Sequence, residues 1–385
     1  MVSLKPRHFG ILLFGRALLN MSYRMVYPFL PALSRGIGVG FEELAILATL
    51  RSACGLVSPF LGFFLDKGSY RFGLFVGILI ILVGALGIFL LPAYWGIISF
   101  FISTGLAKAV YDPAVQAYVS SFFPYETRAR GIGIVETAWA TSWFVGMPIC
   151  AFVLDAWGWR GPFLVIALWG CLAAFLIHAL PAERRVVVPR GYGVTVLSKP
   201  FWVLTMSFLM MFSNENLIIV YGAWMEEAFG LRLGALGVLS FIIGSGELAG
   251  EALVALIGDR LGKKRILTTG LSGLALVYLL IPYVSASIEA VVFVLWLMFF
   301  FSEVAVVSSF AFVSEVVPEA KGYILSINYA CGLTGRLIGS ITGPTVWHWS
   351  GNITFNALLS FSAALLAFLC LKYYSHRARS QSVKG

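Results

Sequence analysis

The sequence predicts an all-α membrane protein with twelve transmembrane helices, arranged as two pseudo-symmetric six-helix bundles. The first observation is composition: 59% of residues are hydrophobic, 12% are charged and the mean hydropathy is +0.90, whereas soluble domains carry roughly 25% charged residues. The second is a series of apolar runs, each long enough to cross a hydrocarbon core of about 30 Å as a helix. The third is an internal repeat of the chain. Because the runs are continuously apolar, they indicate helices and not the strands of a barrel.

Twelve apolar runs can be delimited in order along the chain. They lie at 9–30, 43–65, 72–91, 95–122, 130–155, 162–181, 200–225, 234–257, 266–285, 289–316, 322–348 and 353–373. The stretch between the sixth and seventh runs is polar and contains too few apolar residues to cross a membrane. We therefore expect an N-terminal bundle over 1–181, a cytoplasmic linker over 182–199, and a C-terminal bundle over 200–385 that ends in a short basic tail.

The repeat relates the two halves of the chain. A charged loop around Asp66 returns 193 positions later around Asp259, and Tyr27 is matched by Tyr221 at a separation of 194. A period of half the chain is typical of a duplicated and fused unit, and duplicated membrane units are typical of transporters.

Lys and Arg residues are distributed unevenly among the connections. The connections after the odd-numbered runs hold three of them, Arg35, Arg160 and Arg232, whereas the other connections and the termini hold nineteen. This positive-inside bias predicts an integral membrane protein of the plasma or inner membrane with both termini in the cytoplasm. It also accounts for the net charge of +9 without a nucleic-acid partner.

Five cysteines all fall inside apolar runs, without the paired spacing of a metal site or a disulfide framework. We expect no cofactor and no metal. There is also no nucleophile elbow and no phosphate-binding glycine loop, so the sequence indicates that the protein is not an enzyme.

Charged residues inside the predicted spans are costly in lipid, at roughly 3 kcal/mol each, and therefore mark functional or paired positions. They occur on eight of the spans and are absent from the third, sixth, ninth and twelfth. This pattern predicts eight helices around a polar cavity and four helices outside them. The eleven residues are Arg16, Arg24, Arg51, Lys108, Asp112, Glu136, Glu215, Glu247, Glu251, Glu303 and Arg336.

The loop motif and this layout resemble the major facilitator superfamily, over essentially the whole chain. Its signature between helices 2 and 3, and again between 8 and 9, is Gly-x-x-x-Asp-Arg/Lys-x-Gly-x-x-Arg/Lys. The second copy matches at four positions, although Ala255 replaces the leading Gly. The first copy departs from the pattern because its second Gly, Gly68, and its closing Arg, Arg71, each fall one position early. The motif residues of the two copies are Gly62, Asp66, Lys67 and the displaced Arg71, and Asp259, Arg260, Gly262 and Arg265.

A second motif is similar to that of the drug and metabolite exporters of this superfamily. Gly335, Gly339 and Gly343 recur at four-residue spacing and are followed by Pro344. In helix 4, however, Phe101 stands where such exporters carry an Arg. The resemblance implies efflux by alternating access, and implies that the charged loops latch the two bundles, with Glu315 as an acidic partner.

Residues sharing helical faces suggest roles for the in-span charges. Lys108 and Asp112 lie one turn apart, so they form either a static ion pair or a substrate contact. Glu247 and Glu251 also share a face, and two close carboxylates tend to hold one proton between them. The remaining candidates for protonation or substrate binding are Glu215 beside Asn216, and Glu136 near Trp139.

The function predicted from these features is proton-coupled efflux of a small, amphipathic solute by a secondary transporter. We expect a small-molecule substrate, protons and the lipid bilayer as partners, and a monomer. One alternative is a flippase or carrier for a lipid-like or anionic metabolite, with Arg16, Arg24 and Arg51 as the headgroup site. An alternative from a different class is a sensor or enzyme that kept the fold without transport.

Overall fold

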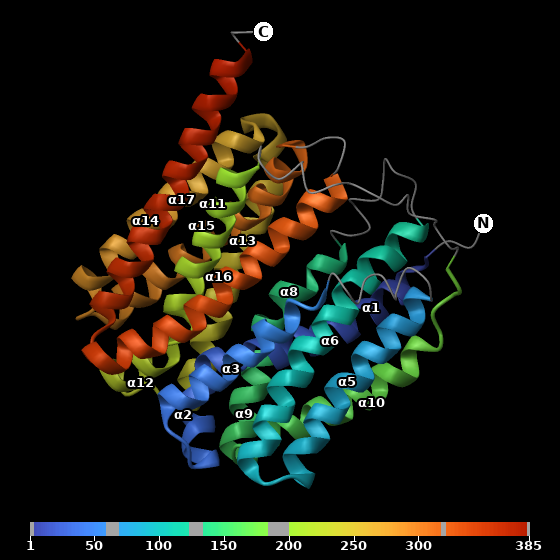
Figure 1. Cartoon of the computed structure of the whole chain (residues 1–385). Coiled ribbons are helices and arrows are strands. Elements are labelled where there is room, and N and C mark those ends of the chain that lie inside the picture. Colours follow the sequence, from blue (N-terminus) through green and yellow to red (C-terminus); the bar gives the residue numbers. More distant parts are fainter. Residues whose placement is uncertain (1–3, 59–68, 123–133, 184–199, 317–320, 383–385) are drawn as a thin grey trace. The chain divides into compact units, whose positions relative to one another are not determined.

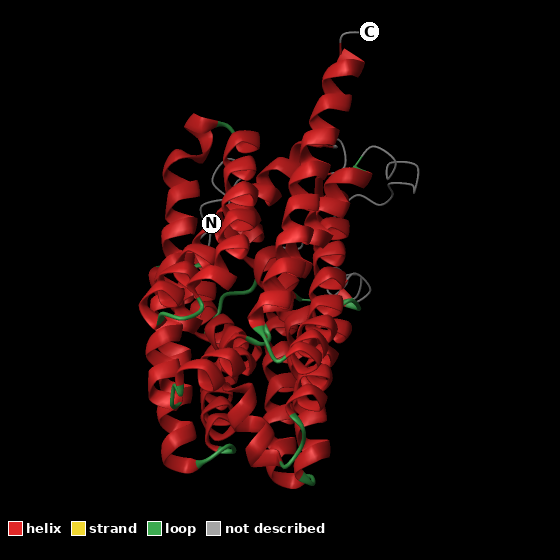
Figure 2. Ribbon diagram, turned by 90° about the vertical axis from the view of Figure 1, so that its left-hand side faces the viewer, coloured by secondary structure: helices red, strands yellow, loops and turns green. Residues whose placement is uncertain are grey.

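The computed structural model describes residues 4–58, 69–122, 134–183, 200–316 and 321–382, and over these residues the chain is helical and contains no strand (Figure 2). The chain is divided into two compact units. The first comprises Met1–Pro189 and Met225–Phe241, and the second comprises Arg190–Trp224 and Ile242–Gly385.

The helices of the first unit begin at Pro6. They are α1 (Pro6–Arg24), α2 (Val26–Ile37), α3 (Phe41–Gly55), α5 (Tyr70–Leu90), α6 (Ala93–Phe122), α8 (Ala138–Thr141), the π-helical segment η1 (Ser142–Gly146), α9 (Met147–Trp157) and α10 (Gly161–Ile177). Two further helices, α12 (Tyr221–Phe229) and α13 (Leu233–Leu261), are divided between the two units.

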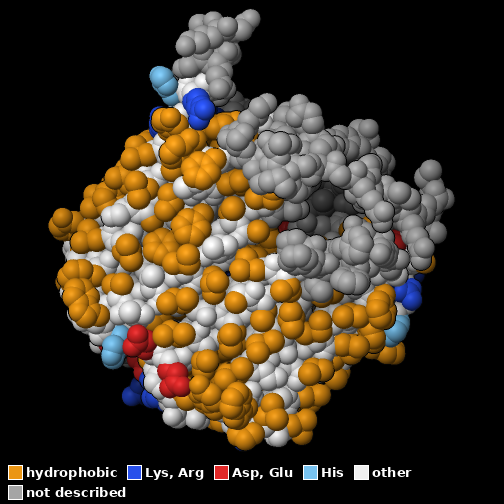
Figure 3. All heavy atoms as spheres, viewed as in Figure 1, with side chains coloured by type: hydrophobic (Ala, Val, Ile, Leu, Met, Phe, Trp, Pro, Cys, Tyr) orange, Lys and Arg blue, Asp and Glu red, His pale blue; other side chains and the backbone are white. Residues whose placement is uncertain are grey.

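The second unit is completed by long helices. They are α11 (Phe201–Ile218), α14 (Lys263–Val284), α15 (Ile288–Val316), α16 (Lys321–Ser350) and α17 (Ile353–Ser382). On the face drawn in Figure 3, hydrophobic side chains predominate and the few visible Lys, Arg, Asp and Glu side chains lie toward its margins. Such a surface suits a lipid environment.

Close helix packing in the first unit depends on small residues. Helix α6 packs along α5 on one side and along α3 on another (Figure 1). A Cβ on Gly84 of α5 would lie 2.5 Å from the Cβ of Ser103, and one on Gly105 of α6 would lie 2.2 Å from the carbonyl oxygen of Arg51. These glycines let the backbones approach, as small residues do in membrane helix pairs. The close approach fixes α6 against both α3 and α5.

The second unit uses the glycine stripe of α16 in the same way. Helix α11 packs against α16 and α17, and α14 packs against α15 and α17. A Cβ on Gly335 would lie 2.2 Å from the carbonyl oxygen of Phe208, and one on Gly343 would lie 2.5 Å from that of Asn216. The stripe that the sequence analysis identified as an exporter motif therefore forms the contact surface between α16 and α11.

Eight helical stretches in the described part of the chain are long and apolar enough to cross a membrane. They are Tyr70–Leu90, Ala93–Val119, Ile134–Trp157, Phe201–Phe229, Leu233–Gly258, Lys263–Val284, Ile288–Val313 and Ile353–Arg377. The other four predicted spans fall on α1 with α2, on α3, on α10 and on α16. The described part of α3 has 15 residues and α10 has 17.

Three spans that the sequence predicted as continuous are interrupted. The run at 9–30 divides at Met25 between α1 and α2, because Pro28 has no N–H to donate to the carbonyl of Arg24 one turn earlier. The run at 130–155 contains η1 just before Pro148, where the N–H of Met147 donates to the carbonyl of Ser142. The run at 200–225 divides at residues 219–220, where the N–H of Val220 donates to Leu217, three residues back.

Candidate functional site

Four charged side chains meet in the first unit, on α1, on α6 and in the segment just before α8. Arg16 Nη2 donates to Glu136 Oε2 at 2.7 Å, and Arg16 Nε lies 3.7 Å from Asp112 Oδ1. Lys108 Nζ lies 3.0 Å from Asp112 Oδ2. The i,i+4 spacing of Lys108 and Asp112 on α6 thus gives an ion pair, and Arg16 links this pair to Glu136. We call these four residues the α1–α6 charge cluster.

The members of this cluster differ in exposure. The Arg16 side chain is 6% exposed and that of Asp112 is 15% exposed, whereas that of Glu136 is 40% exposed. Glu136 also accepts a hydrogen bond from Gln116 Nε2 at 3.2 Å. A buried guanidinium is stabilised only when paired, so Arg16 depends on the two carboxylates, and Glu136 is the partner that solvent and protons reach most easily.

Three buried donors of Arg16 and Asn20 have no hydrogen-bond acceptor among the described residues, and one of them, Arg16 Nε, faces Asp112 Oδ1 at 3.7 Å. Arg16 Nη1 and Asn20 Nδ2 are buried, and neither makes a hydrogen bond among the described residues. Asn20 lies one turn beyond Arg16 on α1, is fully buried, and accepts a hydrogen bond from Lys108 Nζ at 2.7 Å. Asn20 is not among the residues predicted from the sequence. The available signal was its i,i+4 spacing from Arg16 within a predicted span.

The other two arginines that lie inside the predicted spans of this unit are packed on aromatic rings. The guanidinium of Arg24 lies 3.6 Å from the ring centre of Trp139 and 4.9 Å from that of Trp143. That of Arg51 lies 4.2 Å from Tyr23 and donates to the carbonyl oxygen of the same residue. Stacking on a ring face stabilises a cation in a low-dielectric setting. The aromatic rings therefore help to stabilise the charges of both arginines inside the protein.

In the second unit, Glu215 on α11 is fully buried and faces α16. Its Oε2 lies 3.3 Å from Arg336 Nη1, and its Oε1 accepts a hydrogen bond from Ser340 Oγ at 3.0 Å. Two of the eleven in-span charges are therefore brought together here. Each unit thus contains an ion pair between a carboxylate and a guanidinium, on helices predicted to face a polar cavity.

The residues on either side of Glu215 contact different neighbours. Asn214 Nδ2 donates to Ser302 Oγ on α15 at 2.5 Å, and Asn214 Oδ1 accepts from Tyr278 on α14 at 2.6 Å. Asn216 Nδ2 donates to Ser360 on α17 at 2.9 Å. Successive residues point about 100° apart around a helix, so this short polar segment connects α11 to four other helices.

Three further predicted carboxylates lie on α13 and α15. Glu247 and Glu303 are buried, at 5% and 8% exposure, and Glu251 is half-buried. Glu247 and Glu251 both lie on α13, one turn apart, as the sequence predicted.

The loop motifs are described in part. Gly62, Asp66 and Lys67 lie outside the described residues. Arg71, at the start of α5, donates from Nη1 to the carbonyl oxygen of Leu180 at 2.8 Å. That bond ties the start of α5 to the segment just after α10.

The second loop connects α13 and α14. Asp259 and Arg260 belong to the last turns of α13, Arg265 is exposed in the first turn of α14, and Gly262 between them has φ +84°. Glu315, the expected acidic partner, pairs with Lys263 of this loop. The positive φ explains why a glycine occurs at this point of the motif.

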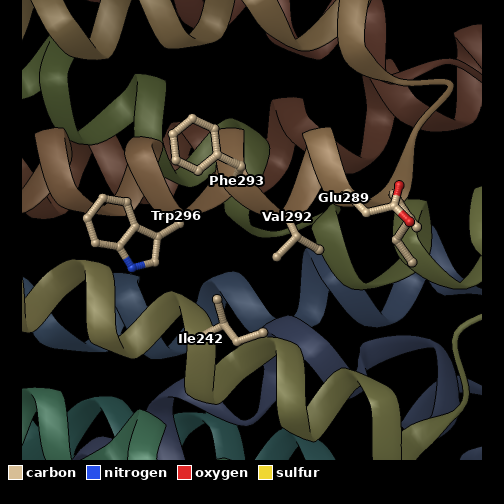
Figure 4. Close-up of a pocket in the computed structure, with 6 residues that line it drawn as sticks. Ile242, Glu289, Val292, Phe293 and Trp296 are labelled. Atoms are coloured by element: carbon tan, nitrogen blue, oxygen red, sulfur yellow. The ribbon is translucent and has the colours of Figure 1, made fainter.

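A separate groove of about 570 Å³ lies between α13 and α15 in the second unit (Figure 4). Its walls are apolar, with Ile242 on one side and Val292 and Trp296 on the other, and Glu289 lies at one end. Trp296 is fixed by a 2.8 Å hydrogen bond from Nε1 to Ser245 Oγ. None of the predicted site residues lines this groove.

Comparison with known families decides the class of protein. The model of the Major Facilitator Superfamily matches residues 12–213 and again residues 203–384. The chain belongs to the Major Facilitator Superfamily. The two successive matches agree with the internal duplication, and the twelve-helix fold in two pseudo-symmetric six-helix bundles, predicted from the sequence, is confirmed.

Curated relatives include drug exporters at low identity. The chain is 22% identical over 377 residues to the "Multi-drug resistance efflux pump PmrA" of Streptococcus pneumoniae, covering 93% of each protein. It is 23% identical over 409 residues to the "Multidrug resistance protein MdtG" of Proteus mirabilis, covering 95% of this chain and 96% of that protein. The chain is therefore an integral multi-pass membrane transporter and not an enzyme, as the sequence predicted.

Solved structures share the fold. A D-xylose-proton symporter superposes with a TM-score of 0.76 at 15% identity, over 94% of this chain and 96% of the other. A bacterial homologue of the human lysosomal transporter Spinster superposes with a TM-score of 0.74 at 14% identity, over 97% and 99% of the two chains. At sequence identities of 14–15%, this similarity establishes the fold alone. The substrate has to be inferred from the residues of the candidate site.

Proposed function

We propose that this transporter exports a small, amphipathic solute in exchange for protons, by alternating access of its two six-helix bundles. The observation that carries the proposal is the α1–α6 charge cluster, in which the buried Arg16 depends on the half-exposed Glu136 at 2.7 Å. The named exporters among the relatives support export as the direction.

Protonation of Glu136 supplies the coupling step. A proton on this carboxylate removes its negative charge and weakens its attraction for Arg16. Arg16 then depends on Asp112, whose Oδ1 lies 3.7 Å from Nε and has no hydrogen-bond donor of its own among the described residues. A movement of Arg16 toward Asp112 shifts α1 relative to α6. Proton binding thereby favours one arrangement of these helices over another.

The second unit offers a further protonation site at Glu215. Its ion pair with Arg336 and its bond from Ser340 fix α11 against α16. Glu247 and Glu251 on α13 are candidates for a shared proton, and Glu303 on α15 is another carboxylate within a span. The Asp259 loop, with Lys263 and Glu315 paired beside it, acts as the latch for one closed arrangement.

The proposal includes the topology inferred from charge. Both termini and the linker at 182–199 are cytoplasmic, because the basic residues gather on that side. The transporter acts as a monomer, with the bundles at 1–181 and 200–385 as its moving parts.

Transport in reconstituted vesicles tests the function. The purified protein is first screened by thermal stabilisation against amphipathic compounds at an acidic and an alkaline pH, and the strongest stabiliser becomes the test solute. With a pH gradient imposed across proteoliposomes, we expect accumulation of this solute on the acidic side, with abolition by a protonophore. Accumulation that ignores the pH gradient and the protonophore would refute proton exchange.

A further inference from the structure

Two side chains on one face of α1 carry hydrogen-bond donors that no described group uses. Arg16 Nη1 and Asn20 Nδ2 both lack an acceptor, although Arg16 is 5% exposed and Asn20 is fully buried. The two residues are four apart, so they are neighbours on the helix surface. Buried donors almost always have an acceptor, so each exception needs an explanation, such as a bound solute, ion or water.

The internal duplication supplies a comparison for Asn20. The residue 194 positions later is Asn214, in the corresponding place on α11. Both halves of the Asn214 amide are satisfied, by Ser302 at 2.5 Å and by Tyr278 at 2.6 Å. The asparagine of the second unit is therefore a structural element in which both the amide nitrogen and the amide oxygen are hydrogen-bonded.

The positions that satisfy Asn214 are different in the first unit. The counterpart of Ser302 at the same offset is Lys108, and the counterpart of Tyr278 is Gly84. Lys108 donates to Asn20 Oδ1 at 2.7 Å, so the amide oxygen is occupied by a cation and Nδ2 is left over. At the corresponding place in the first unit, the asparagine amide nitrogen therefore has no acceptor, whereas in the second unit the amide is hydrogen-bonded to Ser302 and Tyr278.

The charge and the side chains around these donors indicate which kind of ligand they bind. Within the α1–α6 charge cluster the two cations are matched by Asp112 and Glu136. The excess positive charge of this unit comes from Arg24 and Arg51, which lie against the rings of Trp139 and Tyr23. Arg and Lys side chains form their strongest hydrogen bonds with ionised oxygens. Lys108 Nζ also lies 5.3 Å from the ring centre of Trp139 and 5.8 Å from that of Tyr23, so aromatic surface flanks the donors.

We infer that Arg16 Nη1 and Asn20 Nδ2, with Lys108 Nζ beside them, bind the carboxylate of an aromatic, amphipathic solute. The carboxylate accepts from both free donors, and the apolar part of the solute packs near Trp139 and Tyr23. The inference rests on the proposed function in that it takes the chain to be a solute transporter, and it names the class of solute.

Binding to the purified full-length protein tests this site with matched probes. The probes are aryl-alkyl carboxylates, such as naphthylacetate and phenylbutyrate, each compared with its uncharged amide and with the corresponding amine. We expect each carboxylate to bind at least about tenfold more tightly than its amide, the effect of one charge-assisted hydrogen bond. A short-chain phosphatidylglycerol, titrated in parallel, shows whether the site also accepts the phosphate of a lipid headgroup.

Two variants locate the preference and one serves as control. Asn20→Asp keeps the acceptor for Lys108 and replaces the free donor by an oxygen, and Arg16→Lys keeps a cation for Glu136 while removing Nη1. Each should abolish the preference for carboxylates. The control is Asn214→Asp, the same change at the counterpart, where a protonated carboxyl still bonds to Ser302 and Tyr278. It should leave the preference intact.

Thermal unfolding of each variant establishes that it is folded before its binding is compared. Equal binding of carboxylates and amides to the wild type, or a preference that survives in either Asn20→Asp or Arg16→Lys, would overturn the inference and leave the donors to a buried water. If carboxylates bind but their transport moves no protons, the anion site stands and the proton exchange falls. If a neutral or cationic solute is transported in exchange for protons and carboxylates fail to bind, the proton exchange stands and the anion site is refuted.

Discussion

Glu136 is both partly exposed and paired with a buried arginine. Its carboxylate holds the buried Arg16 and also accepts from Gln116, yet its side chain is 40% exposed. Asp112 and Glu215, at 15% and 1%, are far less accessible to a proton. In the proposed mechanism, the most accessible of these three carboxylates is the one that takes up the proton.

The substitution Glu136→Gln should separate proton coupling from solute passage. The amide cannot ionise but still reaches Arg16 and Gln116, so we expect solute exchange between two equal pools to continue while accumulation driven by a pH gradient is lost. Because Arg16 is buried and loses one of its two charged partners, the free energy of unfolding should fall by about 1–3 kcal/mol. Accumulation at the wild-type level would remove Glu136 from the coupling mechanism.

Asn214 shows the opposite case of a polar residue that serves stability. Replacement by Leu leaves the hydroxyls of Ser302 and Tyr278 without their partner in a buried site. We expect a loss of about 1–3 kcal/mol, seen as a lower melting temperature in detergent, with unchanged affinity for solute. A melting temperature equal to that of the wild type would show that the network is not needed for folding.

At the scale of elements, the glycines of α16 determine how closely it approaches α11. Gly335 faces a backbone carbonyl of Phe208, which cannot move without moving α11, whereas a Cβ on Gly332 would meet the flexible Cγ of Met211 at 3.3 Å. The two positions lie one turn apart on one helix, so they form a matched pair.

The substitution Gly335→Ala should destabilise the protein and Gly332→Ala should not. A methyl group at 335 would lie 2.2 Å from the Phe208 oxygen, so the helices must separate, at a cost of about 1–3 kcal/mol from overpacking. The measurement is the melting temperature and the monodisperse fraction after extraction in detergent. Equal behaviour of the two variants would contradict the packing described for α11 and α16.

The helices show which features of the fold could be predicted from the sequence. Continuous apolar runs gave the number and order of spans because hydrophobic length is a local property. The divisions at Met25 and at residues 219–220, and the π-helical segment η1, were missed. Pro28 and Pro148 were visible, but a proline within a membrane helix can be accommodated in several ways, and neighbouring helices decide which.

The site was recovered in part for a related reason. In-span charges are costly in lipid, so Arg16, Lys108, Asp112 and Glu136 could be selected one by one from the sequence. Their assembly into one cluster could not, because it depends on how α1 and α6 pack. Asn20 was missed because an uncharged amide gives a weak signal, and only its missing hydrogen-bond partner distinguishes it from Asn214.

At the scale of the whole molecule, the distribution of Lys and Arg predicts cytoplasmic termini. A fluorescent protein fused after residue 385 should therefore fluoresce, and alkaline phosphatase at the same place should be inactive. A fusion in the connection at Arg232 should show the opposite pattern. Active phosphatase at the C-terminus would reverse the proposed orientation and with it the side on which the charged loops act.

Reciprocal coupling tests the central claim, that solute and protons move through this chain in exchange. The measurement is the internal pH of proteoliposomes loaded with a pH-sensitive dye, without an imposed pH gradient, after addition of the stabilising solute. We predict a change of internal pH that requires both the solute and the protein and that disappears in Glu136→Gln. Solute entry with no change in internal pH would contradict the account.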